Sequence, residues 1–182
     1  ERVTKVKPGM KVVLSWLKGR GADVPGTVYQ SADGPVNSGA ISTFMQRTVT
    51  CENRVTPLPD GLPLREAALL GCAIPTGAGI VFNSLEVKQG ESVVIFGAGG
   101  VGLSALIAAA SIGASPLIVV DIVPDKLEKA KSLGATHAID ARSGDPVAKI
   151  RELTGGQGAR SEEHTSELPS LAYFVCRLLL EK

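Results

Sequence analysis

The chain has 182 residues, of which 44% are apolar, and its 19 basic and 18 acidic residues leave a net charge of +1. The basic residues are scattered among acidic ones, which excludes the clustered positive surface that nucleic-acid backbones need, and no apolar run reaches the roughly 18–20 residues of a membrane helix. Three cysteines and no signal peptide do not suit a secreted disulfide framework, so a reducing cytoplasm is the expected compartment.

The first part of the chain is rich in turn residues and β-like patterns. KPG at 7–9 predicts a turn, VVLSW at 12–16 a strand, and the alternation over 45–58 a further strand. Between them, Gly, Pro, Asp, Asn and Ser recur through position 39, which indicates a long excursion. The pattern predicts a barrel-like β domain. LREAALLG at 64–71 then predicts a short helix ending at Gly71, close to a domain boundary.

After Glu91 the pattern changes to alternating strands and helices. Strands are predicted over 92–96, 116–121 and 136–140, and helices over 101–113, 124–134 and 145–156. Strands that alternate with helices indicate an α/β fold with a parallel, doubly wound sheet. The three strands would make the first half of a Rossmann sheet.

A glycine-rich motif lies directly between the first of these strands and its helix. Gly97, Gly99 and Gly102 form G-x-G-x-x-G, with Gly100 and Val101 inside it. Glycines at these positions permit a tight turn and let the backbone approach a pyrophosphate, whose charge suits the free amides of a helix N-terminus. The motif predicts a phosphate cradle, the alternative being an ordinary tight turn.

Asp121 and Lys126, which both follow the motif in the chain, extend this prediction. Asp121 ends the next strand, where a carboxylate accepts hydrogen bonds from the ribose hydroxyls and repels a 2′-phosphate, so the expected cofactor is NAD and not NADP. A helix cap before Pro124 is the alternative role of Asp121. Lys126 lies where it could reach the ribose, although a lysine one turn into an exposed helix is more often solvated.

Four segments then resemble one family. They are SGAISTF at 38–44, LLGCAIPTGAG at 69–79, VVIFGAGGVGLSAL at 93–106 and VVDIVPDKLEKAKSLGATHAID at 119–140. Their order and spacing are similar to the zinc-containing medium-chain alcohol dehydrogenases over residues 1–159. The resemblance implies a partial GroES-like β-barrel domain over 1–70 and a partial Rossmann NAD-binding domain with its linker helix over 71–159.

The resemblance also implies site residues. Cys72, in a G-C-x-x-x-T-G motif, would be one ligand of a catalytic zinc, Thr76 would lie beside the nicotinamide, and Lys126 would bind the adenosine ribose. Zinc with an open coordination position would polarise the alcohol oxygen and prepare hydride transfer. Without the resemblance, Cys72 reads as a small buried apolar residue.

The chain departs from the family pattern in several places. The other catalytic zinc ligands and the proton relay are expected upstream of Glu1. The segment 15–39, where many relatives carry four cysteines, has none, so no structural zinc is expected. His137 is expected in the sheet, away from the active site, and Cys51 is expected to be a surface or packing cysteine.

The expected function is therefore transfer of a hydride between a primary or secondary alcohol and NAD, with the chain itself an incomplete and inactive fragment. Two alternatives stay open: a zinc-free enone or quinone reductase that uses NAD(P)H, and a non-catalytic nucleotide-binding module. The expected partners are a small-molecule alcohol and its aldehyde or ketone. Family habit implies a homo-oligomer for the parent protein.

Residues 160–182 are expected to lie outside the native fold. The strings RSEEHTSELPS at 160–170 and FVCRLLLEK at 174–182 each differ at one residue from the translation of a common sequencing-library adapter. A single base change in the codon accounts for each difference. The alternative is a natural amphipathic helix. We predict an adapter-derived tail, which removes His164 and Cys176 from the candidate sites.

Overall fold

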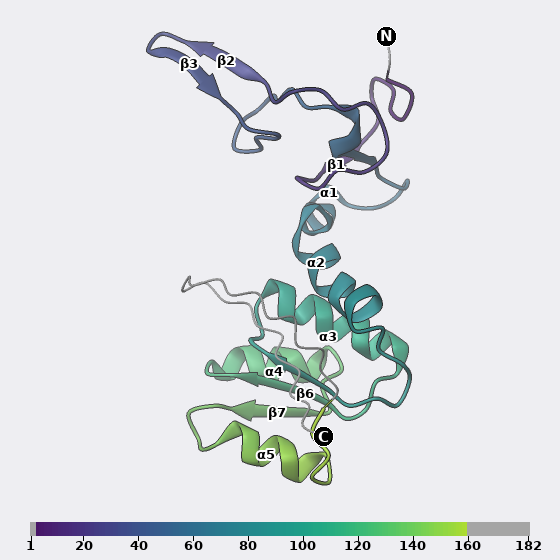
Figure 1. Ribbon diagram of the computed structural model, residues 1–182, viewed down its shortest axis with the longest axis vertical. Helices are drawn as coiled ribbons and strands as arrows, with labels where there is room; N and C mark the ends of the chain where they lie inside the picture. Colours follow the sequence, from purple (N-terminus) through teal and green to yellow (C-terminus); the bar gives the residue numbers. More distant parts are fainter. Residues whose placement is uncertain (1–2, 160–182) are drawn as a thin grey trace. The chain divides into compact units, whose positions relative to one another are not determined.

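The computed structural model describes residues 3–159, so the predicted adapter-derived tail lies outside the described part of the chain. The chain divides into two compact units, Glu1–Cys72 and Ala73–Lys182 (Figure 1). The sequence places the boundary between residues 70 and 71, and the structure divides the chain two residues later.

The first unit is built on two short pairs of antiparallel strands. Strand β1 (Val12–Leu14) pairs with β4 (Val55–Pro57), and β2 (Val28–Ser31) pairs with β3 (Gly34–Asn37). These pairs are two separate two-stranded sheets, and residues 3–72 close no barrel. The expected GroES-like barrel is therefore not confirmed.

The predicted strand over 45–58 is wrong for most of its length. Only Val55–Pro57 forms a strand, β4, and a 3-10 helix, η1 (Glu52–Arg54), interrupts the alternating pattern. Cys51, the residue before η1, is buried, and its Sγ donates a hydrogen bond to Asn53 Oδ1 at 2.7 Å. Cys51 is thus a packing residue and not a surface residue.

The Glu52 carboxylate explains this change of conformation. Oε1 accepts hydrogen bonds from the amides of Thr4, at 2.6 Å, and Lys5, at 2.5 Å, and Oε2 accepts one from the amide of Ala22, at 2.9 Å. Amide donors stabilise the ionised form, and the pKa of Glu52 falls to about 2, chiefly through Ala22, then Lys5 and Thr4. One buried side chain therefore holds two segments that are distant in sequence.

We expect Glu52→Gln to destabilise the first unit at neutral pH, because the amide nitrogen of glutamine cannot accept a bond from Ala22. A depressed carboxyl pKa stabilises the fold fully above its unfolded value, about 4.3. That contribution is lost as pH falls towards 2, so the difference between wild type and variant should shrink below pH 4. Trp16 is the only tryptophan and lies in this unit, so its fluorescence during urea unfolding provides the measurement.

The matched control for this prediction is Glu66→Gln, which changes an exposed carboxyl on helix α1 (Leu64–Ala67). It should leave the urea midpoint of Trp16 fluorescence unchanged at pH 7. Equal midpoints for wild type and Glu52→Gln at pH 7 would contradict the role given to Glu52.

A run of short helices connects the two units along the chain. In the first unit, α1 is followed by the 3-10 helix η2 (Ala68–Gly71), which confirms the short helix predicted over 64–71. The second unit begins with α2 (Ala73–Gly79) and the π-helix η3 (Ile80–Ser84).

Among residues 3–159 no single helix has the length and apolar character to cross a membrane. Leu64–Gly71 and Ala73–Ser84 meet that test only when they are taken together as a bent pair.

The core of the second unit is a three-stranded parallel sheet. Its strands are β5 (Val93–Phe96), β6 (Leu117–Asp121) and β7 (His137–Asp140), in the order β5-β6-β7. Helices α3 (Gly100–Ile112) and α4 (Pro124–Ser132) make the two crossovers, and α5 (Pro146–Leu153) follows β7. Each element lies within two residues of its predicted start, and the prediction of half a Rossmann sheet is confirmed.

Helices cover both faces of this sheet (Figure 1). Val93, Ile95, Leu117 and Val119 pack with α3 and α4 in one core cluster. The alternate residues Val94, Ile118 and Val120 pack with Ile139 of β7 and Ile150 of α5 in a second cluster. The central strand is therefore apolar from Leu117 to Val120, because both of its faces are buried there.

Helix α2 packs closely on the N-terminal turn of α3. Gly77 is buried there, and a Cβ at this position would lie 2.3 Å from Val101 O and 2.7 Å from Ala105 N. Such a separation is too short for any side-chain atom. Glycine at 77 therefore sets the distance between the two helices.

Candidate nucleotide-binding and catalytic site

The candidate site begins at the turn between β5 and α3. Gly97 follows β5 with φ +95°, a left-handed conformation that favours glycine, and its amide donates to Val120 O at 2.7 Å. Gly99 is the N-cap of α3, and its carbonyl accepts the first helical hydrogen bond, from Leu103 N at 2.8 Å. The chain thus turns sharply from strand to helix at the carboxyl edge of the sheet.

Close approach within the turn depends on Gly102. A Cβ at this position would lie 1.9 Å from Gly97 O and 3.1 Å from Gly97 C. The helix therefore begins in contact with the backbone of the strand it follows. This close contact is the packing that the third glycine of a dinucleotide-binding turn permits.

The first amides of α3 have no carbonyl partner inside the helix, a property of every helix N-terminus. In α3 these amides belong to Gly100, Val101 and Gly102, which surround the turn. The helix dipole adds a partial positive charge at the same end. A cradle of this kind is suited to a phosphate group.

Asp121 ends β6 beside this turn and is bound by backbone on both sides. Its Oδ2 accepts a hydrogen bond from Ala98 N at 2.7 Å, and Oδ1 accepts bonds from Ile122 N at 2.7 Å and Val123 N at 2.9 Å. Burial raises the pKa of Asp121, but these three amides and the charge of Lys126 together hold the pKa below its usual value. The carboxylate is therefore ionised and fixed in position at neutral pH.

Lys126 lies in the first turn of α4, exposed to solvent. Its charge lowers the pKa of Asp121, which places the ammonium within electrostatic reach of that carboxylate. No carboxylate in residues 3–159 forms an ion pair with Lys126. The side chain is thus free to reach a ligand bound beside Asp121.

The predicted catalytic residues Thr76 and Cys72 are both exposed. Thr76 lies on α2, one residue before Gly77, which touches the first turns of α3. Ala73, the residue after Cys72, lies 3.8 Å from where a Cβ at Gly100 would be. The helix that carries Thr76 therefore packs against the helix that carries the glycine motif.

The described residues do not form a metal centre by themselves. Within 3–159 no group of three or more His, Cys, Asp or Glu side chains is placed to hold a metal ion, so Cys72 belongs to no such group there. His137 begins β7, and its Nδ1 lies 2.9 Å from Thr136 Oγ1. His137 is a residue of the sheet, as the sequence predicts.

Sequence reasoning missed two features of this edge of the sheet. The three amides that bind Asp121 belong to apolar residues whose identity gives no signal. Asp140 ends β7 in register with Asp121, and Arg142 binds it through Nε–Oδ1 at 3.0 Å and Nη2–Oδ2 at 2.7 Å. The Arg142 bonds lower the pKa of Asp140 to about 2. For Asp140, the available signal was an acidic residue at the end of a strand and before a turn.

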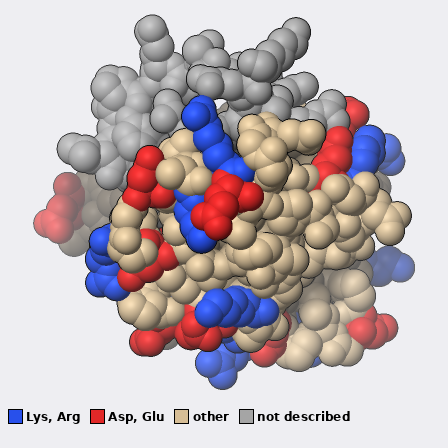
Figure 2. All heavy atoms as spheres, turned by 90° about the horizontal axis from the view of Figure 1, so that it is seen from below, with Lys and Arg blue, Asp and Glu red and all other residues tan. Residues whose placement is uncertain are grey.

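Charges of opposite sign are mixed on the face drawn in Figure 2, where no area of a single sign stands out. Together, the parallel sheet, the glycine turn and the acidic strand end give the second unit the arrangement of half a Rossmann fold.

Comparisons with known proteins agree with this class. Residues 100–161 match the family described as zinc-binding dehydrogenase. The chain is 35% identical to putative alcohol dehydrogenase D of Mycobacterium tuberculosis, over 86% of this chain and 49% of that protein. The chain spans about half the length of the curated relatives it matches.

Many solved structures are similar to the chain, and two of them illustrate the range. Benzyl alcohol dehydrogenase from Acinetobacter calcoaceticus is 34% identical with a TM-score of 0.71, covering 86% of this chain and 48% of that one. A quinone oxidoreductase from Pseudomonas syringae is 32% identical with a TM-score of 0.57, covering 60% and 34%. The family match and these relatives support placing the chain with the zinc-containing medium-chain alcohol dehydrogenases.

Proposed function

We propose that the chain binds NAD at the glycine turn and that the whole protein transfers a hydride between a primary or secondary alcohol and this cofactor. The observation that carries the proposal is the fixed Asp121 carboxylate beside the Gly97–Gly102 contact. Nucleotide binding is proposed for the chain itself. Alcohol oxidation is proposed for the whole protein, because the chain spans about half the length of its relatives.

The chain's own residues would hold the nucleotide in three ways. The amides of Gly100, Val101 and Gly102 would bind the pyrophosphate at the start of α3. Asp121 has about four lone-pair positions, of which three accept backbone amides, and the remaining one would accept from a ribose hydroxyl. Lys126 would donate to the same ribose. When bound, NAD supplies the hydride acceptor, and Thr76 would lie beside its nicotinamide ring.

The charge of Asp121 supports NAD over NADP. A 2′-phosphate would place a second negative group against an ionised carboxylate whose position is fixed by three backbone amides. Lys126 alone offsets only part of that repulsion. We therefore propose a preference for the unphosphorylated cofactor.

Zinc dependence is proposed from family membership. Cys72 is exposed and would supply one thiolate ligand. Because Cys72 belongs to no group of three or more potential ligands within residues 3–159, the described chain does not fit a zinc ion by itself, and no reaction step is assigned to the metal here. A structural zinc is not part of the proposal, since the segment 15–39 has no cysteine.

The proposal is tested by titrating the chain with NADH and NADPH while following nucleotide fluorescence. We expect NADPH to bind at least about tenfold more weakly than NADH, a difference of about 1.4 kcal/mol. Lys126→Met should weaken NADH binding by roughly threefold to tenfold, because it removes one charged hydrogen bond at a partly solvated site.

The matched control is Lys129→Met, which removes an exposed lysine from the same helix. It should leave the NADH dissociation constant unchanged. Equal affinity for NADH and NADPH would refute the role of Asp121, and equal effects of the two lysine variants would refute that of Lys126.

A second candidate is a zinc-free reductase of enones or quinones. The similarity to a quinone oxidoreductase favours it. Preference of the chain for NADPH would support this candidate over the first.

For either activity, we propose from the family alone that the whole protein is a homo-oligomer and lies in the cytoplasm.

A further inference from the structure

The first unit contains a cavity of about 410 Å³. Its lining residues are Lys18, Asp23, Val24, Pro25, Gly26, Ala40, Cys51 and Arg54. Cavities that bind small molecules commonly have about 300–1,000 Å³. None of the lining residues is among those of the candidate nucleotide site.

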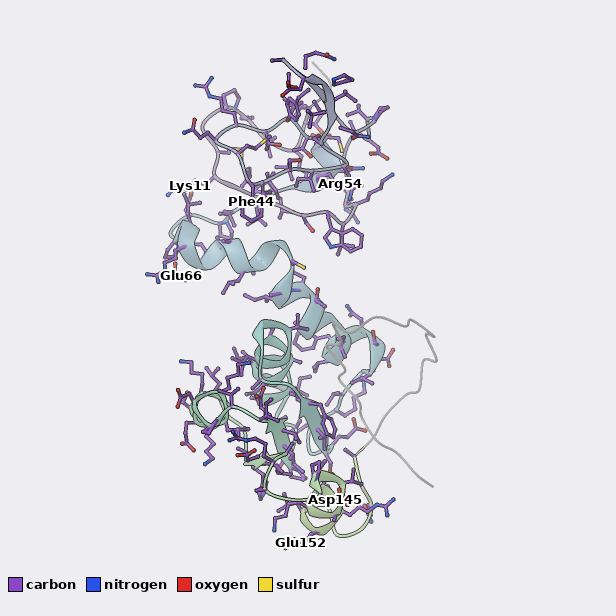
Figure 3. All side chains as sticks on the ribbon, turned by 90° about the vertical axis from the view of Figure 1, so that its left-hand side faces the viewer. Lys11, Phe44, Arg54, Glu66, Asp145 and Glu152 are labelled. Carbon is purple, nitrogen blue, oxygen red and sulfur yellow. The ribbon has the colours of Figure 1, made fainter. Side chains whose placement is uncertain are left out.

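A buried arginine without a partner lines this cavity. Arg54, labelled in Figure 3, has 9% of its surface exposed, and its Nε has no hydrogen-bond partner. No carboxylate in residues 3–159 forms an ion pair with its guanidinium. The arginine side chain keeps its charge at every accessible pH, and buried charges are normally paired. Within residues 3–159, Arg54 is therefore a buried cation without an anion to neutralise it.

The backbone holds Arg54 firmly at this place. Its amide donates to Cys51 O at 3.1 Å, and its carbonyl accepts from Ser15 N at 2.9 Å. Because η1 and β1 hold the backbone from both sides, the main chain of Arg54 is fixed before any ligand binds. A planar guanidinium with free donors suits the two oxygens of a carboxylate.

The remaining charges of the cavity select among anions. Lys18 Nζ and Asp23 Oδ2 form an ion pair at 2.6 Å, so the two side chains balance each other. Arg54 then leaves the cavity with one unbalanced positive charge. A single negative charge would neutralise it, whereas a doubly charged phosphate would leave the cavity with an excess negative charge.

The other walls are suited to an organic group. Val24, Pro25 and Ala40 present aliphatic surface to the cavity. From the unpaired buried Arg54, the balanced Lys18–Asp23 pair and these apolar walls, we propose that the cavity binds a small organic monocarboxylate. Its two oxygens accept hydrogen bonds from Arg54, and its apolar part packs on the aliphatic wall.

The test uses isotope-labelled full chain and benzoate as the probe. The NMR signal of the Arg54 Nε–H group, assigned through the side-chain carbons of the wild-type chain, is followed as benzoate is added. We expect a saturable shift with a dissociation constant on the order of 1 mM, typical for a ligand of this size. Benzamide, which is neutral and of the same shape, should leave the signal in place.

Two variants complete the test. Arg54→Gln should weaken benzoate binding about tenfold or more, while Arg47→Gln, the same change at an exposed arginine of this unit, should not alter it. An Arg54 signal that stays fixed throughout the benzoate titration would overturn the proposal, and this wild-type result does not depend on whether Arg54→Gln folds. A larger shift with inorganic phosphate than with benzoate would overturn the monocarboxylate assignment.

Discussion

Gly102→Ala should abolish measurable NADH binding and destabilise the second unit by about 3 kcal/mol or more. The new Cβ would lie 1.9 Å from Gly97 O, and the atom it meets is backbone, which cannot rotate away. Relief requires α3 to move off the end of β5, which pulls the first-turn amides away from the position of the pyrophosphate. Chemical denaturation followed by far-ultraviolet circular dichroism measures the stability, and fluorescence titration measures NADH binding.

The matched control is Gly100→Ala, two residues earlier in the same helix. There a Cβ would meet only Ala73 Cβ, at 3.8 Å, an ordinary van der Waals distance. Its free energy of unfolding should equal or slightly exceed that of wild type, since alanine favours a helix over glycine. Equal stabilities of Gly102→Ala and Gly100→Ala would contradict the close contact described here.

Asp121→Asn should weaken NADH binding at least about tenfold and cost about 1–2 kcal/mol of stability at pH 7. The asparagine oxygen can still accept from Ile122 and Val123. Its NH₂ group, however, would face the amide of Ala98, so two donors would oppose each other at the turn. Amide hydrogen exchange at Ala98 should therefore become faster, which NMR detects independently of nucleotide.

The pH dependence gives a second check on Asp121. Its pKa in the folded chain is lowered, so the stability it provides is complete above the unfolded value of about 3.9 and is lost as pH falls through the folded value. The stability gap between wild type and Asp121→Asn should close accordingly at acidic pH. Asp125→Asn, at an exposed position on α4, should show little effect on NADH binding. A gap that persists at low pH would argue against an ionised Asp121.

Much of the second unit could be predicted because its signals are local. The apolar run of β6 is buried on both faces, and glycines or prolines mark the ends of the adjacent elements. The start of each strand and helix was therefore predicted to within two residues. The linker was harder to predict. It continues from α2 into the π-helix Ile80–Ser84, whose hydrogen-bond pattern depends on packing rather than on sequence periodicity.

The first unit shows why the alternating pattern over 45–58 failed. Glu52 sits in that alternation as an outward-facing strand residue would, yet its carboxylate is buried and binds amides 30 to 48 residues away. Such long-range bonds leave no mark on the local pattern. The positions of site candidates could be predicted from motif spacing, but the triple bonding of Asp121 and the unpaired Arg54 required coordinates.

The bond between Asp121 and Ala98 has a consequence for redesign of cofactor preference. Replacing the carboxylate with a small neutral group is the direct way to admit a 2′-phosphate. In this chain the same change removes the acceptor that holds the glycine turn at Ala98. In the proposed NAD site, cofactor specificity and turn geometry would thus reside in one side chain, so conversion to NADP would require a second substitution that supplies a new acceptor for that amide.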